Sequence, residues 1–114
     1  MYNLRVIKNK TRKTVIAENV SRKNIFNKSL GLLGKKSAEA IMFKTRFGIH
    51  TFGLRFPIDV IILNKNGEIV ALKKRMKANR IFLWNPRFDT VIELPADTIE
   101  KSKTEKGDII EASL

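Results

Sequence analysis

The sequence contains no cysteine and only one histidine, His50. Without thiols the chain can form no disulfide, no thiolate nucleophile and no cysteine-based zinc site, and a single imidazole excludes a multi-histidine metal site. We therefore expect no metal and no other cofactor. No serine lies in a nucleophile-elbow motif and residues 31–34 do not form a phosphate loop, so no catalytic triad is visible and enzymatic activity stays an open question.

Long apolar runs are also missing. The apolar run at residues 60–63 spans four residues, whereas a membrane-spanning helix needs roughly 20. Residues 1–13 alternate charged and apolar side chains and lack the apolar core of a signal peptide. These absences predict a cytoplasmic protein without a membrane partner.

Positive charge is what the chain has in excess. Its 114 residues include 23 Lys and Arg against 11 Asp and Glu, for a formal net charge of +12. The balance is +9 over residues 1–36, +7 over residues 37–87 and −4 over residues 88–114. This asymmetry predicts a basic face and a more acidic C-terminal edge. Many lysines with no glutamine are also typical of heat-adapted proteins, so a compositional bias is an alternative explanation of the charge.

Short alternating segments predict one domain over residues 1–114, built mostly of strands. A period of two marks a hairpin over the first 18 residues, with a turn at residues 9–11. Ser21 is placed to cap a helix that ends near Leu33. Strands are expected at residues 41–43, 47–52 and 58–63. The last of these is expected to be central, because it is apolar on both faces apart from one aspartate.

The second half of the chain has the strongest hairpin signal. Asn66-Gly67 separates the strand at residues 58–63 from one at residues 68–72. Asp97 followed by Glu100 predicts a capping box for a short helix, and further strands are expected at residues 80–84, 90–94 and 109–112. The elements together predict a mostly β (α+β) fold: a bent antiparallel sheet or small barrel with two short helices.

One long segment resembles a known family. Residues 48–60 read GIHTFGLRFPIDV, which is similar to the signature of the domain of unknown function 192 family, a group of uncharacterised bacterial and archaeal proteins. The flanking motifs agree, and they read GLLGK at residues 31–35, IMF at 41–43, IELPA at 92–96 and GD at 107–108. The resemblance covers about residues 20–112. It implies a small, mostly β, barrel-like fold and no assigned activity.

Two positions depart from the family's pattern. The late motif usually continues to a glycine where this chain has Asp97, and a proline common before the family's arginine is replaced by Ala78, two residues before Arg80. The resemblance therefore carries no loop function over to these two positions.

Asp59 is the most informative single residue. A carboxylate that begins an apolar strand must be paired, hydrogen-bonded or exposed, because an unpaired buried charge is strongly destabilising. His50, Arg55 and Arg80 are candidate partners. One hypothesis is a polar pocket of His50, Arg55, Asp59 and Glu93, in which Asp59 orients His50 as an acid or base. The other is a structural carboxylate that accepts backbone N–H bonds.

Two of these pocket candidates also have simpler explanations. His50 alternates with Ile49 along a strand, and a lone histidine is usually packed or hydrogen-bonded. Glu93 alternates with Ile92 and Leu94, and for such an acid we favour a solvent-facing position over a place in a pocket.

A basic and aromatic stretch follows the second hairpin. A period of two places Arg80, Phe82 and Trp84 on one face of a strand, with Ile81 and Leu83 on the other. If the aromatic face meets solvent, a nucleic-acid base stacked on such a ring gains about 1–3 kcal/mol. The alternative is that Phe82 and Trp84 belong to the core.

The leading hypothesis is a small non-catalytic binding module for nucleic acid or another polyanion. Its candidate residues are basic side chains and one stacking ring, namely Arg22, Lys23, Lys73, Lys74, Arg75, Lys77, Arg80 and Trp84. The alternative is a small-ligand-binding protein or enzyme built on the polar pocket around His50, Asp59 and Glu93. A third class, a protein that binds partners through a sheet edge, has no specific support, since lysine-rich edges discourage such pairing.

Overall fold

The computed structural model describes residues 4–113 apart from residues 23–38. Over this part of the chain the elements are, in order, β1 Leu4–Asn9, β2 Thr14–Arg22, β3 Ile41–Lys44, β4 Gly48–His50, β5 Ile58–Leu63, β6 Ile69–Met76, β7 Ile81–Leu83, β8 Thr90–Pro95, α1 Thr98–Lys101 and β9 Ile110–Ser113. The mostly β prediction is confirmed.

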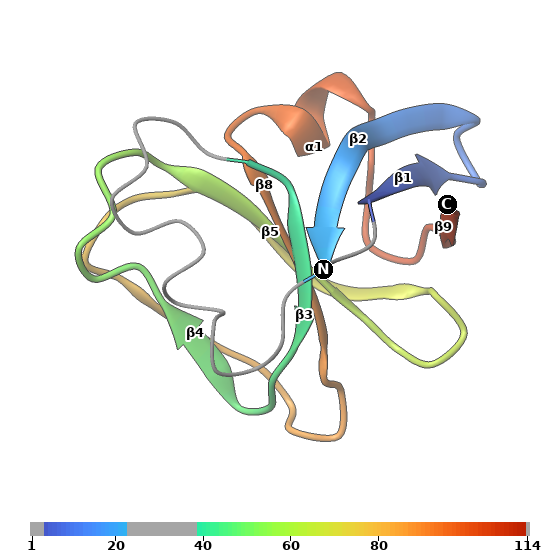
Figure 1. The fold of residues 1–114 in the computed structure, drawn as a ribbon. Coiled ribbons are helices and arrows are strands. Elements are labelled where there is room, and N and C mark those ends of the chain that lie inside the picture. The colour runs from blue at the N-terminus through green and yellow to red at the C-terminus, as the bar shows by residue number, and fades with distance from the viewer. Residues whose placement is uncertain (1–3, 23–38, 114) are drawn as a thin grey trace.

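Seven of the strands form one bent sheet, in the order β6-β5-β8-β3-β2-β1-β9, while β4 and β7 form a separate two-stranded sheet (Figure 1). Neighbouring strands are antiparallel, except that β2 and β3 run parallel. The large sheet bends until its two edges approach each other, and Glu68 and Ile109 form a bridge there. Because this is an isolated bridge, the sheet is bent but not closed into a barrel.

Apolar side chains lie on both faces of the large sheet. One cluster contains Ile61 of β5 and Ile99 of α1, and the other contains Val60 of β5 and Ile49 of β4. All six residues of β5 are buried, as predicted for a central strand covered on both sides. The two-stranded sheet therefore covers one face of the large sheet, and α1 lies against the other.

The first predicted helix does not begin at Ser21. This residue lies in β2, where its backbone pairs with Leu4 of β1 and Ile41 of β3. Strand pairing on two sides outweighs a local capping preference, which is worth only about 1 kcal/mol. The rest of that predicted helix lies outside the described residues.

The C-terminal helix α1 forms where it was predicted, but a different carboxylate caps it. Asp97 has φ 75° and makes no side-chain cap hydrogen bond. Its carboxylate instead accepts hydrogen bonds from Nη1 of Arg75 at 2.7 Å. Asp59 Oδ2, from β5, accepts the N–H of Ile99 in the first turn of α1 at 2.8 Å. The capping-box prediction is therefore wrong, and the left-handed backbone at Asp97 is one that glycine adopts without strain.

Asp59 connects β5, β6 and α1. Its side chain is fully buried, and Oδ1 accepts the backbone N–H of Arg75 at 2.9 Å. Arg75 has φ 49° and lies where the pairing of β5 with β6 shifts register, between Ile58 and Val60. The contacts of Asp59 are those of a structural carboxylate, which fixes a bulge in β6 and the start of α1 at once.

Replacing Asp59 with alanine leaves the N–H groups of Arg75 and Ile99 without an acceptor in a buried place. We expect Asp59→Ala to lower the free energy of unfolding by about 2–4 kcal/mol, measured by urea denaturation. The control is Asp97→Asn, which removes an exposed ion pair while asparagine tolerates the positive φ, and it should leave the unfolding midpoint close to that of the unchanged protein. Equal losses in the two variants would contradict the role assigned to Asp59.

A second buried polar cluster lies at the start of β9. Asp108 Oδ2 accepts hydrogen bonds from Nδ2 of Asn9 at 2.9 Å, Nε of Arg12 at 3.0 Å and the backbone N–H of Glu105 at 2.9 Å. Burial by itself raises the pKa of Asp108, but these three hydrogen bonds outweigh it, and the pKa lies below its usual value.

Because the native pKa of Asp108 is lowered, its ionised form stabilises the folded state above the unfolded-state pKa of about 3.9. This stabilisation is lost as the pH falls through the lower native value. We expect Asp108→Asn to melt at a lower temperature at neutral pH, and to show a smaller further decrease between about pH 5 and about pH 2 than the unchanged protein. Circular dichroism melts across this range test the prediction, and parallel pH profiles would contradict it.

Candidate functional site

Two segments that are far apart in the sequence lie side by side around the small sheet. β4 pairs with β7, and Thr51 extends the contact: its Oγ1 donates to the carbonyl of Lys77 at 2.6 Å and accepts the backbone N–H of Arg80 at 2.9 Å. These bonds hold residues 46–57 against residues 75–87 (Figure 1). We call the surface of these two segments the β4–β7 surface.

The β4–β7 surface contains six basic residues and no acidic residue of its own. The basic residues are Arg46, Arg55, Arg75, Lys77, Arg80 and Arg87. Two of them pair with acids from elsewhere: Arg46 with Asp89 at 3.6 Å, and Arg75 with Asp97 at 2.7 Å. The other four are exposed and form no ion pair within the described part of the chain.

Three of these cations line one pocket. Arg55, Arg75 and Lys77 surround a hollow of about 330 Å³ between the β4–β5 loop and the end of β6. The remaining lining residues are apolar, namely Leu54, Phe56, Pro57 and Ala78. A pocket with cations, apolar walls and no acid suits an anionic group such as a phosphate.

Large apolar side chains are also exposed on this surface. Phe47 is 66% exposed, Phe52 47%, Ile81 61% and Leu83 69%. Over the described residues, the other large apolar side chain exposed in this way is Val15 of β2. Four such residues gathered around one small sheet are typical of an interaction surface.

The aromatic side chains of β7 face the core, so the exposed aromatic face considered in the sequence analysis does not form. Phe82 and Trp84 are half-buried against the apolar cluster beneath the small sheet, and Nε1 of Trp84 donates to the carbonyl of Phe88 at 2.8 Å. Ile81 and Leu83 face the solvent instead. The alternation of residues defines the two faces of a strand, but it does not say which face packs against the core. Here the two aromatic rings pack against the apolar cluster of the large sheet. Trp84 is therefore not an exposed stacking group.

The basic stretch on β6 is partly neutralised by the acidic C-terminal segment. Lys74 pairs with Glu100 at 3.1 Å, next to the pair of Arg75 with Asp97. Lys73 is exposed on the same strand and has no ion pair among the described residues. The predicted basic face is thus incomplete along β6 and continues on the β4–β7 surface.

The other predicted cations are distributed between two regions. Lys77 and Arg80 belong to the β4–β7 surface, where Nη1 of Arg80 donates to the carbonyl of Ala78 at 3.3 Å. Arg22 is the last residue of β2, and Lys23 lies outside the described residues. Arg46 and Arg87 were not among the basic residues predicted from the sequence. The signal that could have found them is the absence of Asp and Glu from residues 46–57 and 75–87.

The predicted polar pocket does not form, because His50 and Asp59 lie on opposite sides of the large sheet. Asp59 shares a face of β5 with Ile61 and contacts α1. His50 belongs to β4, which covers the other face, and is exposed. Its Nδ1 accepts the backbone N–H of Phe52 at 3.2 Å.

Glu93 does not face Asp59 either. Glu93 pairs with Val60, the residue after Asp59, so its side chain points to the face opposite Asp59. Glu93 is only 5% exposed, which corrects the expectation of a solvent-facing acid. Arg55 lies in the cationic pocket instead.

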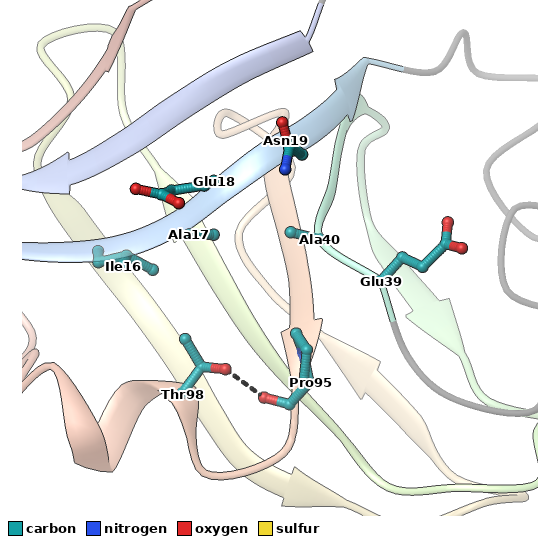
Figure 2. Close-up of a pocket in the computed structure, with 8 residues that line it drawn as sticks. All are labelled: Ile16, Ala17, Glu18, Asn19, Glu39, Ala40, Pro95 and Thr98. Atoms are coloured by element: carbon teal, nitrogen blue, oxygen red, sulfur yellow. Dashed lines mark hydrogen bonds between the residues drawn. The ribbon is translucent and has the colours of Figure 1, made fainter.

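A second pocket, of about 510 Å³, lies between β2, the start of β3 and α1 (Figure 2). Its lining residues are Ile16, Ala17, Glu18, Asn19, Glu39, Ala40, Pro95 and Thr98. Glu18 and Glu39 are its charged residues, and in Figure 2 their carboxylates point away from each other. Thr98 Oγ1 donates to the carbonyl of Pro95 at 2.7 Å. The acidic lining makes this pocket a poor site for an anion.

Neither a metal cluster nor a membrane helix is found in the part of the chain that the structure describes. No three His, Asp or Glu side chains are placed there to hold a metal ion. No helix there is long and apolar enough to cross a membrane.

Comparison with known proteins identifies the family. The family model DUF192, described as Uncharacterized ACR, matches residues 6–112. The chain belongs to this family. No curated protein matches it. The DUF192 signature at residues 48–60 contributes both Asp59 and one half of the β4–β7 surface.

Two solved structures share the fold of this DUF192 protein. A protein of unknown function from Novosphingobium aromaticivorans DSM 12444 has a TM-score of 0.79 at 11% identity, with 96% of this chain and 84% of that chain covered. A "putative transcription regulator" from Sinorhizobium meliloti 1021 has a TM-score of 0.74 at 13% identity, with 98% and 94% covered. Similarity at such low identity shows a common fold alone.

Proposed function

We propose that this DUF192 protein is a small non-catalytic module that binds nucleic acid or another polyanion through the β4–β7 surface. The observation that supports the proposal is a surface with six basic residues and no acid of its own, four of the six being exposed and without an ion pair among the described residues. Attraction between cations and backbone phosphates is largely independent of base sequence, so such a surface is sufficient for binding.

The local surface supports the proposal better than the net charge does. Several cations outside it are neutralised, for example Arg12, which pairs with both Glu105 and Asp108. A bias in overall composition explains a high lysine content, but it does not explain two adjoining segments that both lack acids. An enzyme pocket is not proposed, because His50 and Asp59 lie on opposite sides of the sheet.

Each of the four cations without an ion pair has a place in this proposal. Arg55 and Lys77, which line the pocket, would each contact one phosphate group, and Arg80 and Arg87 would each contact a further phosphate along the surface. If four duplex phosphates are contacted, the logarithm of the affinity should fall by about 3–4 for each tenfold increase in salt.

Removing two of the free cations should weaken binding. We expect the double variant Arg55→Gln, Lys77→Gln to bind labelled DNA at least several-fold more weakly and to lower the salt slope by about two phosphate contacts, measured by fluorescence anisotropy. Its control is Lys8→Gln, Lys10→Gln, which removes the same charge from the exposed end of the β1–β2 hairpin. Binding that does not change between low and high salt would contradict the proposal.

Releasing a paired cation should have the opposite effect. Asp97→Gly frees Arg75 from its ion pair, and glycine adopts φ 75° without strain, so the fold should be retained. We expect tighter DNA binding and a salt slope that is steeper by about one phosphate contact.

The matched control for Asp97→Gly is Glu111→Gln. It changes the net charge by the same amount on β9, which lies far from β4 (Figure 1). It should leave the affinity nearly unchanged. An equal gain in both variants would show that net charge alone, and not the β4–β7 surface, determines binding.

A further inference from the structure

We infer that the polyanion bound by the β4–β7 surface is a single-stranded nucleic acid, whose unpaired bases stack on exposed aromatic rings while the cations hold its phosphates. The inference rests on the proposed function and names its ligand class. It is argued from a different set of residues, namely the exposed apolar side chains of the β4–β7 surface.

Phe47 is the first of these residues. Its backbone has φ 74° and its side chain is 66% exposed. A bulky side chain at positive φ strains the backbone, and an exposed ring gains little from burial. Folding therefore favours glycine at this position, and strained exposed residues of this kind are concentrated at functional sites. The phenylalanine is explained if its ring contacts a ligand.

A second ring lies at the other end of β4. Phe52 is 47% exposed and stacks on His50, with ring centroids 5.0 Å apart and an angle of 26° between the ring planes. The backbone N–H of Phe52 donates to Nδ1 of His50 at 3.2 Å. This hydrogen bond fixes the imidazole beside residue 52, and the two stacked rings lie near the solvent, as a stacking platform requires.

Between the two rings the small sheet presents two exposed apolar side chains, Ile81 and Leu83. Leu83 lies opposite Gly48, and Ile81 lies opposite His50. A Cβ at Gly48 would come within 2.6 Å of Leu83 Cδ2, so the glycine allows Leu83 to lie over β4. The outer face of the small sheet thus connects Phe47 to His50 and offers apolar contact to bases and sugars.

Cations lie next to these exposed apolar residues, so a negatively charged ligand complements the charge of the surface. Arg46 precedes Phe47 and Arg80 precedes Ile81, and the pocket of Arg55 and Lys77 adjoins the loop that follows Phe52. Duplex DNA offers phosphates but keeps its bases stacked inside, whereas a single strand offers both phosphates and free base faces. A surface that carries both exposed rings and cations therefore favours a single strand over a duplex.

The experiment compares a labelled thymidine oligonucleotide with a duplex of the same length across a salt series. We expect the single strand to bind about ten-fold more tightly than the duplex at equal salt. Phe47→Gly should weaken single-strand binding by about ten-fold, leave duplex binding unchanged, and leave the unfolding midpoint unchanged or higher because glycine accepts φ 74°.

Two further variants separate ring stacking from general apolar contact. Phe52→Leu keeps an apolar side chain but removes the ring, and should also weaken single-strand binding. Val15→Ala removes the exposed apolar residue on β2, outside the β4–β7 surface, and should have no effect.

The outcomes distinguish this inference from the function on which it rests. Salt-dependent binding that is equal for single strand and duplex would overturn the inference and leave the proposed function standing. No salt-dependent binding to either would overturn both. Binding to phosphatidylserine vesicles that Phe47→Gly abolishes, without a preference for the single strand, would replace the nucleic acid by a membrane surface.

Discussion

The pair of hydrogen bonds accepted by the buried Asp59 carboxylate is the constraint on which the rest of the fold depends. One bond holds a bulge in β6 at Arg75, and the other holds the first turn of α1 at Ile99. Bulges bend a strand, so the chain leaves the edge of the large sheet just after Arg75 and meets Thr51. The position of β7 against β4, and with it the β4–β7 surface, follows from this bend.

The acidic residues of the C-terminal segment make contacts within the fold. Asp108 is buried among hydrogen-bond donors, while Asp97 and Glu100 pair with cations of β6. These acids neutralise one side of a basic protein. The segments around β4 and β7 lie away from them for the most part, and that separation leaves four exposed cations without an ion pair among the described residues.

The ligand contacts that we propose for the β4–β7 surface are of two kinds, each of them weak when separate. Cations attract phosphates over a distance but are screened by salt, whereas exposed rings act only at contact and are insensitive to salt. In this DUF192 protein both lie on a small sheet whose inner face is held by Phe82 and Trp84. The outer face therefore stays exposed while the inner face packs against the large sheet.

Local patterns in the sequence were enough to predict most strands, the central position of β5, the hairpin at Asn66-Gly67 and the family. They also showed that Asp59 must have partners, because a buried charge cannot lack them. Only the tertiary structure decided that these partners are two backbone N–H groups, that Ser21 lies in a strand and that Trp84 faces inward. Alternation and capping preferences act between near neighbours, whereas these outcomes depend on which distant strands cover each face, and burial against those strands outweighs local preference.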